Sequence, residues 1–194
     1  IFMIALAYID PGDEVILSDP SWVSYEACIR LAGGVPVYVP TRYEDEFVLD
    51  PAAVEAAVTP RTKMIILNTP SNPTGTVIPE NVLREIARIA EEHDLLVMSD
   101  EIYESIIYEG KHTSFASLPG MFDRTLLVSG LSKTYAMTGW RLGWAIGSEE
   151  NIKAINKLHA LGKKDEESEP EEPETPTAEE LLTEIRDLLK EQQK

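Results

Sequence analysis

The sequence is built around Ser129-Gly-Leu-Ser-Lys-Thr-Tyr-Ala-Met-Thr-Gly-Trp-Arg-Leu-Gly143, which directly follows the apolar run Leu126-Leu-Val128. The apolar run predicts a buried strand, so Lys133 is expected just past a strand end. Burial disfavours a charged ammonium, and an amine without its proton can attack a carbonyl and form a Schiff base. Arg141 and the hydroxyls of Ser129 and Ser132 offer donors that suit a phosphate. An ordinary solvated lysine in a Gly-rich loop is the alternative that this stretch leaves open.

Composition narrows the functional class. The chain has 194 residues and a net charge of −17, which allows one domain with an appendage and argues against a general nucleic-acid or anionic-membrane binder. Cys28 is the only cysteine, so no intramolecular disulfide can form and a reducing, cytoplasmic location is expected. No apolar run approaches the roughly 18 residues that a membrane span needs. The chain begins in what reads as mid-helix, so we expect a fragment.

Strand and helix patterns alternate along most of the chain. Apolar runs predict strands near residues 14–18, 35–39, 63–67, 95–98, 124–128 and 142–146. Helices are expected near residues 1–9, 22–32, 51–58, from Pro79 onward, and over 149–160. This order predicts an α/β fold with a mostly parallel sheet that helices bury on both faces. Sheets of this kind bind ligands at the carboxyl ends of their strands.

Polar clusters follow three of the predicted strands. They are Asn68-Thr-Pro-Ser-Asn-Pro-Thr-Gly75, Ser99-Asp-Glu-Ile-Tyr103 and Ser129-Gly-Leu-Ser-Lys133. Each cluster alone could be turn material, a helix cap or a packed ring. Together with Arg141 they supply an amine for an aldehyde, a carboxylate for a ring nitrogen, a phenol, an amide and a cation for a phosphate. Pyridoxal phosphate needs those partners.

With these motifs in this order, residues 1 to about 158 resemble the class I/II aminotransferases, which are fold-type I pyridoxal-phosphate enzymes. The resemblance implies that residues 1–160 form a partial cofactor-binding large domain, because the segment before it and the small domain after it are missing. It also implies pyridoxal 5'-phosphate as cofactor, amino-acid and 2-oxo-acid substrates, a dimeric core and no bound metal.

The same resemblance implies one cofactor site, made of Trp22, Asn72, Asp100, Tyr103, Ser132, Lys133 and Arg141. Lys133 is the implied catalytic residue, which holds the cofactor as a Schiff base and moves the substrate proton, and Asp100 keeps the pyridine nitrogen protonated. Asn72 and Tyr103 bond the ring oxygen, and the serine and the arginine bind the phosphate. Trp22 stacks on the ring in this interpretation, and packing at a strand end is its alternative.

The carboxyl-terminal sequence departs from this family. Residues 161–177 are acidic and rich in Pro and Glu, which is typical of a solvated linker. Residues 178–194 predict an amphipathic helix that opens with a capping box of Thr177 and Glu180. Residues from about 152 to 194 resemble the cytoplasmic end of large-conductance mechanosensitive channels, which implies a pentameric bundle without a membrane span in this chain.

Two hypotheses follow from the sequence. The first is a pyridoxal-phosphate-dependent aminotransferase that is impaired by its missing segments. The second is a non-catalytic chimeric or truncated protein whose tail self-associates. The sequence does not identify the amino-acid substrate, because the parts of the enzyme family that grip the substrate lie outside it.

Overall fold

The computed structural model describes the backbone of residues 1–166 and the side chains of residues 1–160. The helices are α1 (Phe2–Tyr8), α2 (Ser24–Leu31), α3 (Pro51–Ala57), α4 (Glu80–Glu92) and α5 (Glu149–Glu166). The strands are β1 (Glu14–Asp19), β2 (Val35–Pro40), β3 (Thr62–Asn68), β4 (Leu96–Asp100), β5 (Thr125–Gly130) and β6 (Gly143–Ile146). Short 3₁₀ turns are η1 (Tyr43–Asp45), η2 (Phe115–Ser117), η3 (Phe122–Arg124) and η4 (Thr138–Trp140). Each helix and strand expected within these residues is present.

The strands form one mixed sheet in the order β2-β1-β3-β4-β5-β6. All neighbouring pairs are parallel except β5 and β6, which are antiparallel. The predicted α/β fold with a mostly parallel sheet is therefore confirmed. The register places Asn68 opposite Asp100 and Asp100 opposite Val128. The three polar clusters thus emerge from one carboxyl edge of the sheet.

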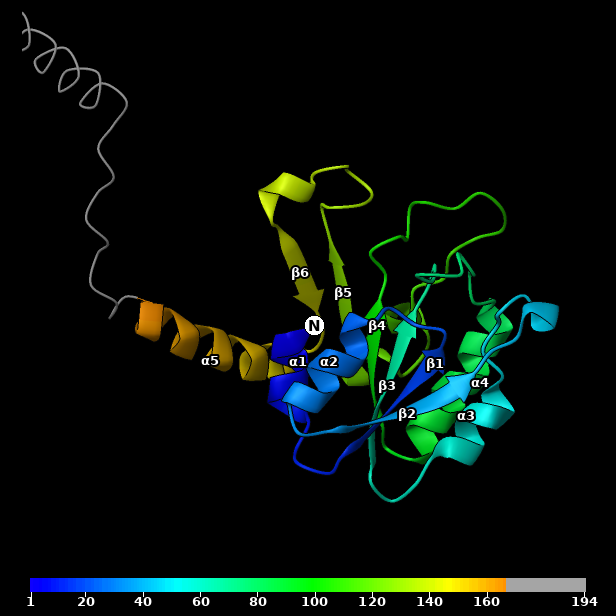
Figure 1. Cartoon of the computed structure of the whole chain (residues 1–194), viewed down its shortest axis with the longest axis horizontal. Helices are drawn as coiled ribbons and strands as arrows, with labels where there is room; N and C mark the ends of the chain where they lie inside the picture. Colours follow the sequence, from blue (N-terminus) through cyan, green and yellow to red (C-terminus); the bar gives the residue numbers. More distant parts are fainter. Residues whose placement is uncertain (167–194) are drawn as a thin grey trace, which may run out of the picture. The chain divides into compact units, whose positions relative to one another are not determined.

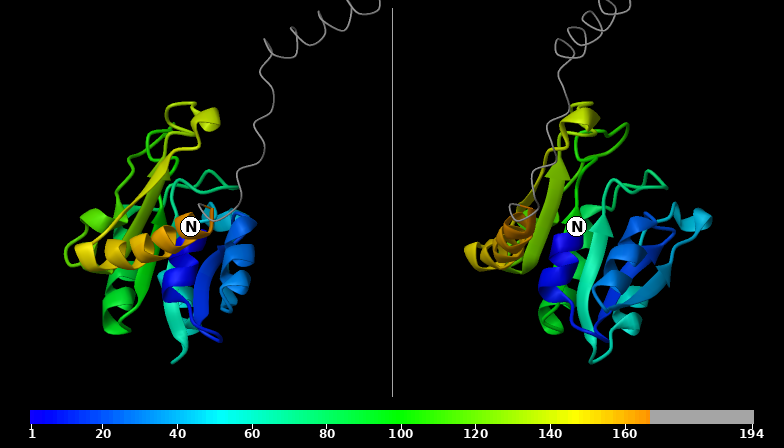
Figure 2. Two further views of the ribbon diagram at one scale, coloured as in Figure 1. Left: turned by 90° about the vertical axis from the view of Figure 1, so that its left-hand side faces the viewer. Right: turned by 60° about the vertical axis from the view of Figure 1, so that its left-hand side comes forward.

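Helices cover both faces of the sheet, with α1 and α2 on one face and α3 and α4 on the other (Figures 1 and 2). Side chains of successive strand residues point to opposite faces, so a strand buried on both sides must be apolar throughout. On the α1 and α2 face the sheet contributes Val15, Leu17, Met64, Ile66 and Met98. On the α3 and α4 face it contributes Ile16, Ile65, Leu67 and Val97. These alternating sets give the domain two cores.

Local sequence signals account for the helices that cover the second core. The side chain of Asp50 accepts a hydrogen bond from the backbone N of Ala52 at 3.0 Å, and Pro51 is the first residue of α3, as predicted. In α4 the apolar positions recur on one face, where Leu83, Ile86, Ala87, Ile89 and Ala90 are buried.

The prediction that the strands are buried on both faces is wrong at the two edges of the sheet. Val35 on β2 and Ile146 on β6 each remain 45% exposed. An edge strand has one neighbour only, and the helices pack mainly over the central strands. Pro36 in β2 fits this position, because proline cannot donate a ladder hydrogen bond and is tolerated at edges.

The described residues cover only the first part of the predicted carboxyl-terminal segment. A division falls between His159 and Ala160, and α5 continues to Glu166, past the expected start of the linker at residue 161. Residues 167–177 of the predicted linker and the predicted helix over 178–194 lie outside the described residues. Within residues 1–166, no helix combines the length and the apolar character that crossing a membrane requires.

Truncation of a core side chain should test this packing. Ile86 is fully buried in α4, so Ile86→Ala should lower the free energy of unfolding by about 2–5 kcal/mol through lost apolar contact and a residual cavity. Chemical denaturation followed by circular dichroism measures the change. Leu31→Ala is the control, because Leu31 is 73% exposed and its loss should cost no more than about 0.5 kcal/mol. Equal costs for the two variants would contradict the described core.

Candidate active site

A pocket of about 210 Å³ lies at the carboxyl edge of the sheet. Its lining includes five of the predicted site residues, which are Trp22, Asn72, Asp100, Tyr103 and Lys133. Ile1, Tyr25, Asn68, Ile102 and Val128 complete it. The five predicted residues lie at or after the ends of β1, β3, β4 and β5. Neighbouring parallel strands end at one edge, and this is why residues far apart in sequence meet here.

Asp100 is the buried acid of the pocket. It is 5% exposed, and its Oδ2 accepts a hydrogen bond from the Tyr25 hydroxyl at 2.7 Å. Its Oδ1 accepts the backbone N–H of Ile102 at 3.2 Å. Burial raises the pKa of Asp100, while the bonds from Tyr25 and Ile102 act in the opposite direction. Burial of Tyr25, and then its contact with the Asp100 carboxylate, raise the pKa of Tyr25, so its hydroxyl stays a donor.

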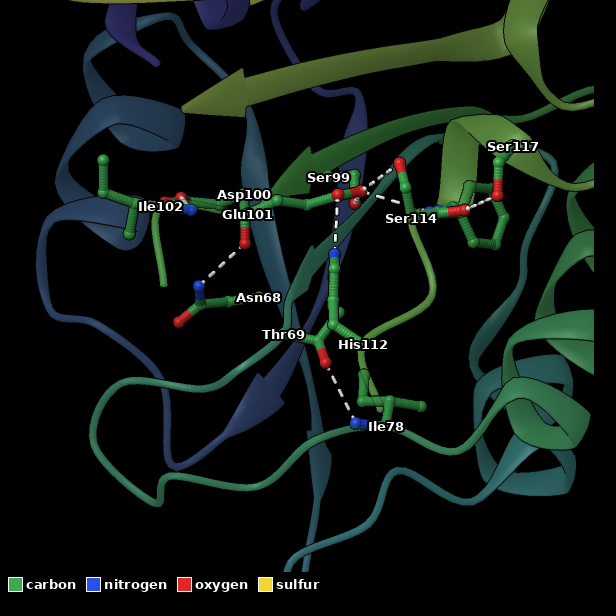
Figure 3. A network of polar contacts seen from close by, with 11 residues as sticks. Asn68, Thr69, Ile78, Ser99, Asp100, Glu101, Ile102, His112, Ser114 and Ser117 are labelled. Atoms are coloured by element: carbon green, nitrogen blue, oxygen red, sulfur yellow. Dashed lines mark hydrogen bonds and ion pairs between the residues drawn. The ribbon is translucent and has the colours of Figure 1, made fainter. Parts of the chain in front are cut away.

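Asn68 connects the end of β4 to the loop that carries Asn72. Its side-chain N donates to the backbone O of Asp100 at 2.9 Å (Figure 3). Its Oδ1 accepts the backbone N–H of Asn72 at 2.7 Å. One amide therefore links the backbone of Asp100 to the backbone of Asn72. The Asn68 side chain itself lines the pocket beside them.

Lys133 lines the pocket but is exposed. The expectation that Lys133 is buried beside the strand is wrong, because the loop after β5 extends beyond the helices that cover the sheet (Figure 1). The Nζ atom lies 5.4 Å from the centroid of the Tyr103 ring, within the range of a cation–π contact. The amine is therefore presented to the pocket beside the phenol.

Neither of the two predicted phosphate ligands is among the residues that line the pocket. Arg141 is exposed at the end of η4, with φ at 50°, and its guanidinium donates to the backbone O of Thr138 at 3.3 Å. Ser132 is half-buried next to Lys133. The structure thus assembles residues for a ring and an aldehyde, whereas the phosphate-binding role of Ser132 and Arg141 stays a prediction.

A pair of glycines sets the position of the lysine loop. Gly130 and Gly143 face each other across β5 and β6. A Cβ on Gly130 would lie 2.9 Å from the backbone O of Leu142 and 3.0 Å from the Cα of Gly143. Only glycine permits this approach, so the loop from β5 to β6 leaves the sheet from a closely packed base.

Sequence reasoning missed Tyr25 and Asn68. Tyr25 lies three residues after Trp22, and their rings meet edge to face with centroids 5.3 Å apart. That spacing at the start of a helix was an available signal, since residues three apart share a helix face. Asn68 lies within the polar cluster of residues 68–75, but its bond to the backbone of Asp100 depends on the register of two strands, which the sequence does not state.

Comparison with known proteins identifies the family. Residues 1–162 match the family described as aminotransferase class I and II. The chain belongs to this family. It is 52% identical over 162 residues to a bifunctional aspartate aminotransferase and glutamate/aspartate-prephenate aminotransferase of Petunia hybrida, covering 82% of this chain and 34% of that relative. It is 52% identical over 157 residues to the aspartate/prephenate aminotransferase of Thermus thermophilus, covering 80% and 40%.

Solved aminotransferase structures share the fold. Aspartate aminotransferase from Thermus thermophilus with maleate has a TM-score of 0.81 and 49% sequence identity, covering 84% of this chain and 42% of that one. Aromatic aminotransferase from Pyrococcus horikoshii has a TM-score of 0.81 and 46% identity, covering 84% and 44%. The chain therefore spans less than half the length of the aminotransferases it matches.

Class I and II aminotransferases use pyridoxal 5'-phosphate, and the pocket's functional groups fit its ring portion. The lining combines an amine, a buried carboxylate, two amides and a phenol with the apolar surfaces of Trp22, Ile102 and Val128. These match an aldehyde, a ring nitrogen, a ring hydroxyl and a flat aromatic body in turn.

The raised pKa of Asp100 has a consequence for stability. A carboxyl whose pKa is higher in the folded state binds its proton more tightly when folded. The wild type should therefore lose stability as the pH rises from about 3.8, the ordinary aspartate value, through the raised folded pKa. Asp100→Asn should lack this loss, so its stability relative to the wild type should increase across that window.

Denaturation at a series of pH values measures the difference. Tyr25→Phe serves as the comparison, because removing a bond that lowers the pKa of Asp100 should extend the loss to higher pH. A constant difference between Asp100→Asn and the wild type at every pH would contradict the burial of this carboxyl.

Proposed function

We propose that the chain is the cofactor-binding part of an aminotransferase that moves an amino group from an amino acid to a 2-oxo acid with pyridoxal 5'-phosphate. One observation carries the proposal. Five residues from four strand ends line a single pocket, and they are Trp22, Asn72, Asp100, Tyr103 and Lys133. An amine next to a phenol, in a pocket that also holds a buried acid, has little value to the fold alone, whereas it is the set that this cofactor's ring requires.

The substrate class is inferred from the relatives. Those described above are named as aspartate, aspartate/prephenate or aromatic aminotransferases. We propose a dicarboxylic amino acid such as aspartate as amino donor, since aspartate recurs in these names. A homodimer is proposed for the whole protein. The chain spans 34% to 40% of those curated relatives, so these proposals concern the complete protein rather than the chain by itself.

The chain's own residues have distinct tasks in this reaction. Bound pyridoxal phosphate supplies an electron sink for the negative charge that develops at the substrate Cα. Lys133 presents the amine that holds the aldehyde and, once released, can move a proton at that carbon. Asp100 provides the negative charge that keeps a ring nitrogen protonated, and the Tyr25 hydroxyl helps to keep Asp100 ionised despite its burial.

Orientation comes from the surrounding side chains. Asn72 and Tyr103 can donate to the ring hydroxyl, and the Tyr103 ring also lies near the lysine ammonium, which limits where the amine moves. The indole of Trp22 is held edge to face by Tyr25, so it can cover one side of a flat ring and exclude water there.

The proposed domain limits are residues 1–160 for the partial large domain, 161–177 for the linker and 178–194 for the terminal helix, although residues 161–166 of the linker belong to α5. The family match ends at residue 162, so the channel-like tail and its pentameric bundle have no support from it. Self-association of the tail stays a prediction, and no observation favours a purely non-catalytic protein.

Covalent labelling should test the proposed function. Borohydride added in the presence of pyridoxal 5'-phosphate should attach the label to the peptide containing Lys133, because this amine lies in the pocket. Lys133→Ala should reduce labelling by at least about tenfold, which peptide mapping by mass spectrometry quantifies. Lys111→Ala is the control, since Lys111 is exposed and is not among the residues of the pocket. Labelling spread evenly over surface lysines, unchanged in Lys133→Ala, would refute the proposal.

A further inference from the structure

Glu101 is a fully buried carboxylate next to the site acid. It is 0% exposed, and its Oε1 accepts hydrogen bonds from Ser99 Oγ at 2.8 Å, Ser114 Oγ at 3.0 Å and Phe115 N at 3.1 Å (Figure 3). Its Oε2 lies 2.8 Å from Nε2 of His112. An ionised carboxylate only accepts, so Nε2 of His112 is the donor in this pair. Burying a charge is costly unless its acceptors are occupied, and both oxygens are.

Asp100 and Glu101 extend toward opposite faces of the sheet. Asp100 is bonded to Tyr25, which belongs to the α1 and α2 core, and Glu101 is bonded to the backbone of Phe115, which belongs to the α3 and α4 core. Successive strand residues alternate in this way. The trans peptide holds the two Cα atoms at a fixed separation, so anchoring both the side chain and the backbone N of Glu101 restricts where the Cα of Asp100 can lie. The backbone N of Glu101 also donates to Val128 at 2.9 Å.

The Glu101 side chain also closes the loop that carries Tyr103. No helix or strand lies between Asp100 and Phe115 in the structure. Glu101 stands at the beginning of this loop, and His112, Ser114 and Phe115 stand at its end. Inside it, turns bond Glu104 N to Glu101 O at 2.9 Å and Ile106 N to Tyr103 O at 2.8 Å. The Glu101 carboxylate therefore holds the start and the end of the loop between Asp100 and Phe115 together, and this supports the turn at Tyr103.

A bound divalent cation is the competing explanation. Ligand atoms of Glu101, Glu104 and His112 lie within 4.8 Å of one another. The Glu101 oxygens, however, already have protein donors from two hydroxyls, a backbone N–H and an imidazole. Those donors would have to turn away for a cation to bind, so the observed contacts favour a protein-only network.

We propose that Glu101, held by His112, is a positioning residue that fixes Asp100 and Tyr103 in the cofactor pocket. The inference rests on the proposed function for what the pocket binds, but the fixing itself is a property of the chain. It acts through the two residues that line the pocket, since Glu101 is not among the lining residues.

Conservative variants separate positioning from general stability. Glu101→Gln replaces one acceptor oxygen by an NH2 group, which must face either Nε2–H of His112 or the backbone N–H of Phe115. Toward His112, the result is two donors against each other. If the imidazole changes tautomer to accept that N–H, its Nδ1–H is left buried, and Nδ1 has no partner among the described residues. His112→Leu removes the donor, whereas His112→Gln keeps an N–H that can reach the carboxylate. Glu109→Gln is the matched control, because Glu109 is exposed in the same loop.

The first readout is the affinity for pyridoxal 5'-phosphate. It is titrated by visible absorbance under solution conditions in which all variants are folded. Glu101→Gln and His112→Leu should weaken binding by about tenfold, the usual size for partners that orient a binding residue. His112→Gln and Glu109→Gln should stay within about threefold of the wild type. The proposal would be overturned if folded Glu101→Gln and His112→Leu bound the cofactor with wild-type affinity. It would also be overturned if added Zn²⁺ or Mg²⁺ raised the free energy of unfolding of the wild type but not that of His112→Leu.

Hydrogen exchange without cofactor is the second readout, and it keeps the two proposals apart. Amides of residues 100–104 should exchange at least about tenfold faster in Glu101→Gln than in Glu109→Gln, while the exchange of α4 amides stays unchanged. Equal exchange in residues 100–104 would overturn the positioning role. If the wild type binds no pyridoxal 5'-phosphate, the proposed function fails, and the exchange data alone decide whether Glu101 fixes this segment.

Discussion

The burial of the Asp100 carboxylate is the constraint on which the site depends. A charged group at the end of a central strand is costly unless it is bonded, and here the Tyr25 hydroxyl and the Ile102 N–H occupy its oxygens. Satisfying it requires α2 to present Tyr25 on one face and the chain to turn sharply after β4. Asp100 thus links α2, on one face of the sheet, to the start of the loop that carries Tyr103.

Much of the fold could be predicted because its signals are local or periodic. Continuous apolar runs identified the central strands, Asp50 and Pro51 marked the start of α3, and the spacing of apolar residues identified α4. The edges of the sheet were harder. A run such as Val35–Val39 looks apolar whether a helix covers it or not, so the exposure of an edge strand depends on the order of strands, which no single segment encodes.

The residues of the site show the same difference between local signals, which the sequence contains, and contacts that depend on the tertiary arrangement. The predicted set combined polar motifs that follow strands with Trp22, which the family resemblance alone implied. Five of its members line one pocket, whereas Ser132 and Arg141 are not among the lining residues. Their supports were not predicted. The bonds of Tyr25 to Asp100 and of His112 to Glu101 join residues whose distance depends on register and loop path. The exposure of Lys133 escaped prediction for a related reason, because a strand's burial does not extend to the loop beyond it.

The paired glycines at the base of the β5–β6 hairpin bear on how the protein tolerates change. Gly130 and Gly143 meet with no room for a methyl group on Gly130, so the hairpin cannot absorb an alanine there by small adjustments of side chains. A randomised library across this hairpin should keep both codons fixed and vary the tip, where exposed residues such as Tyr135 and Trp140 leave the framework free to accept diversity.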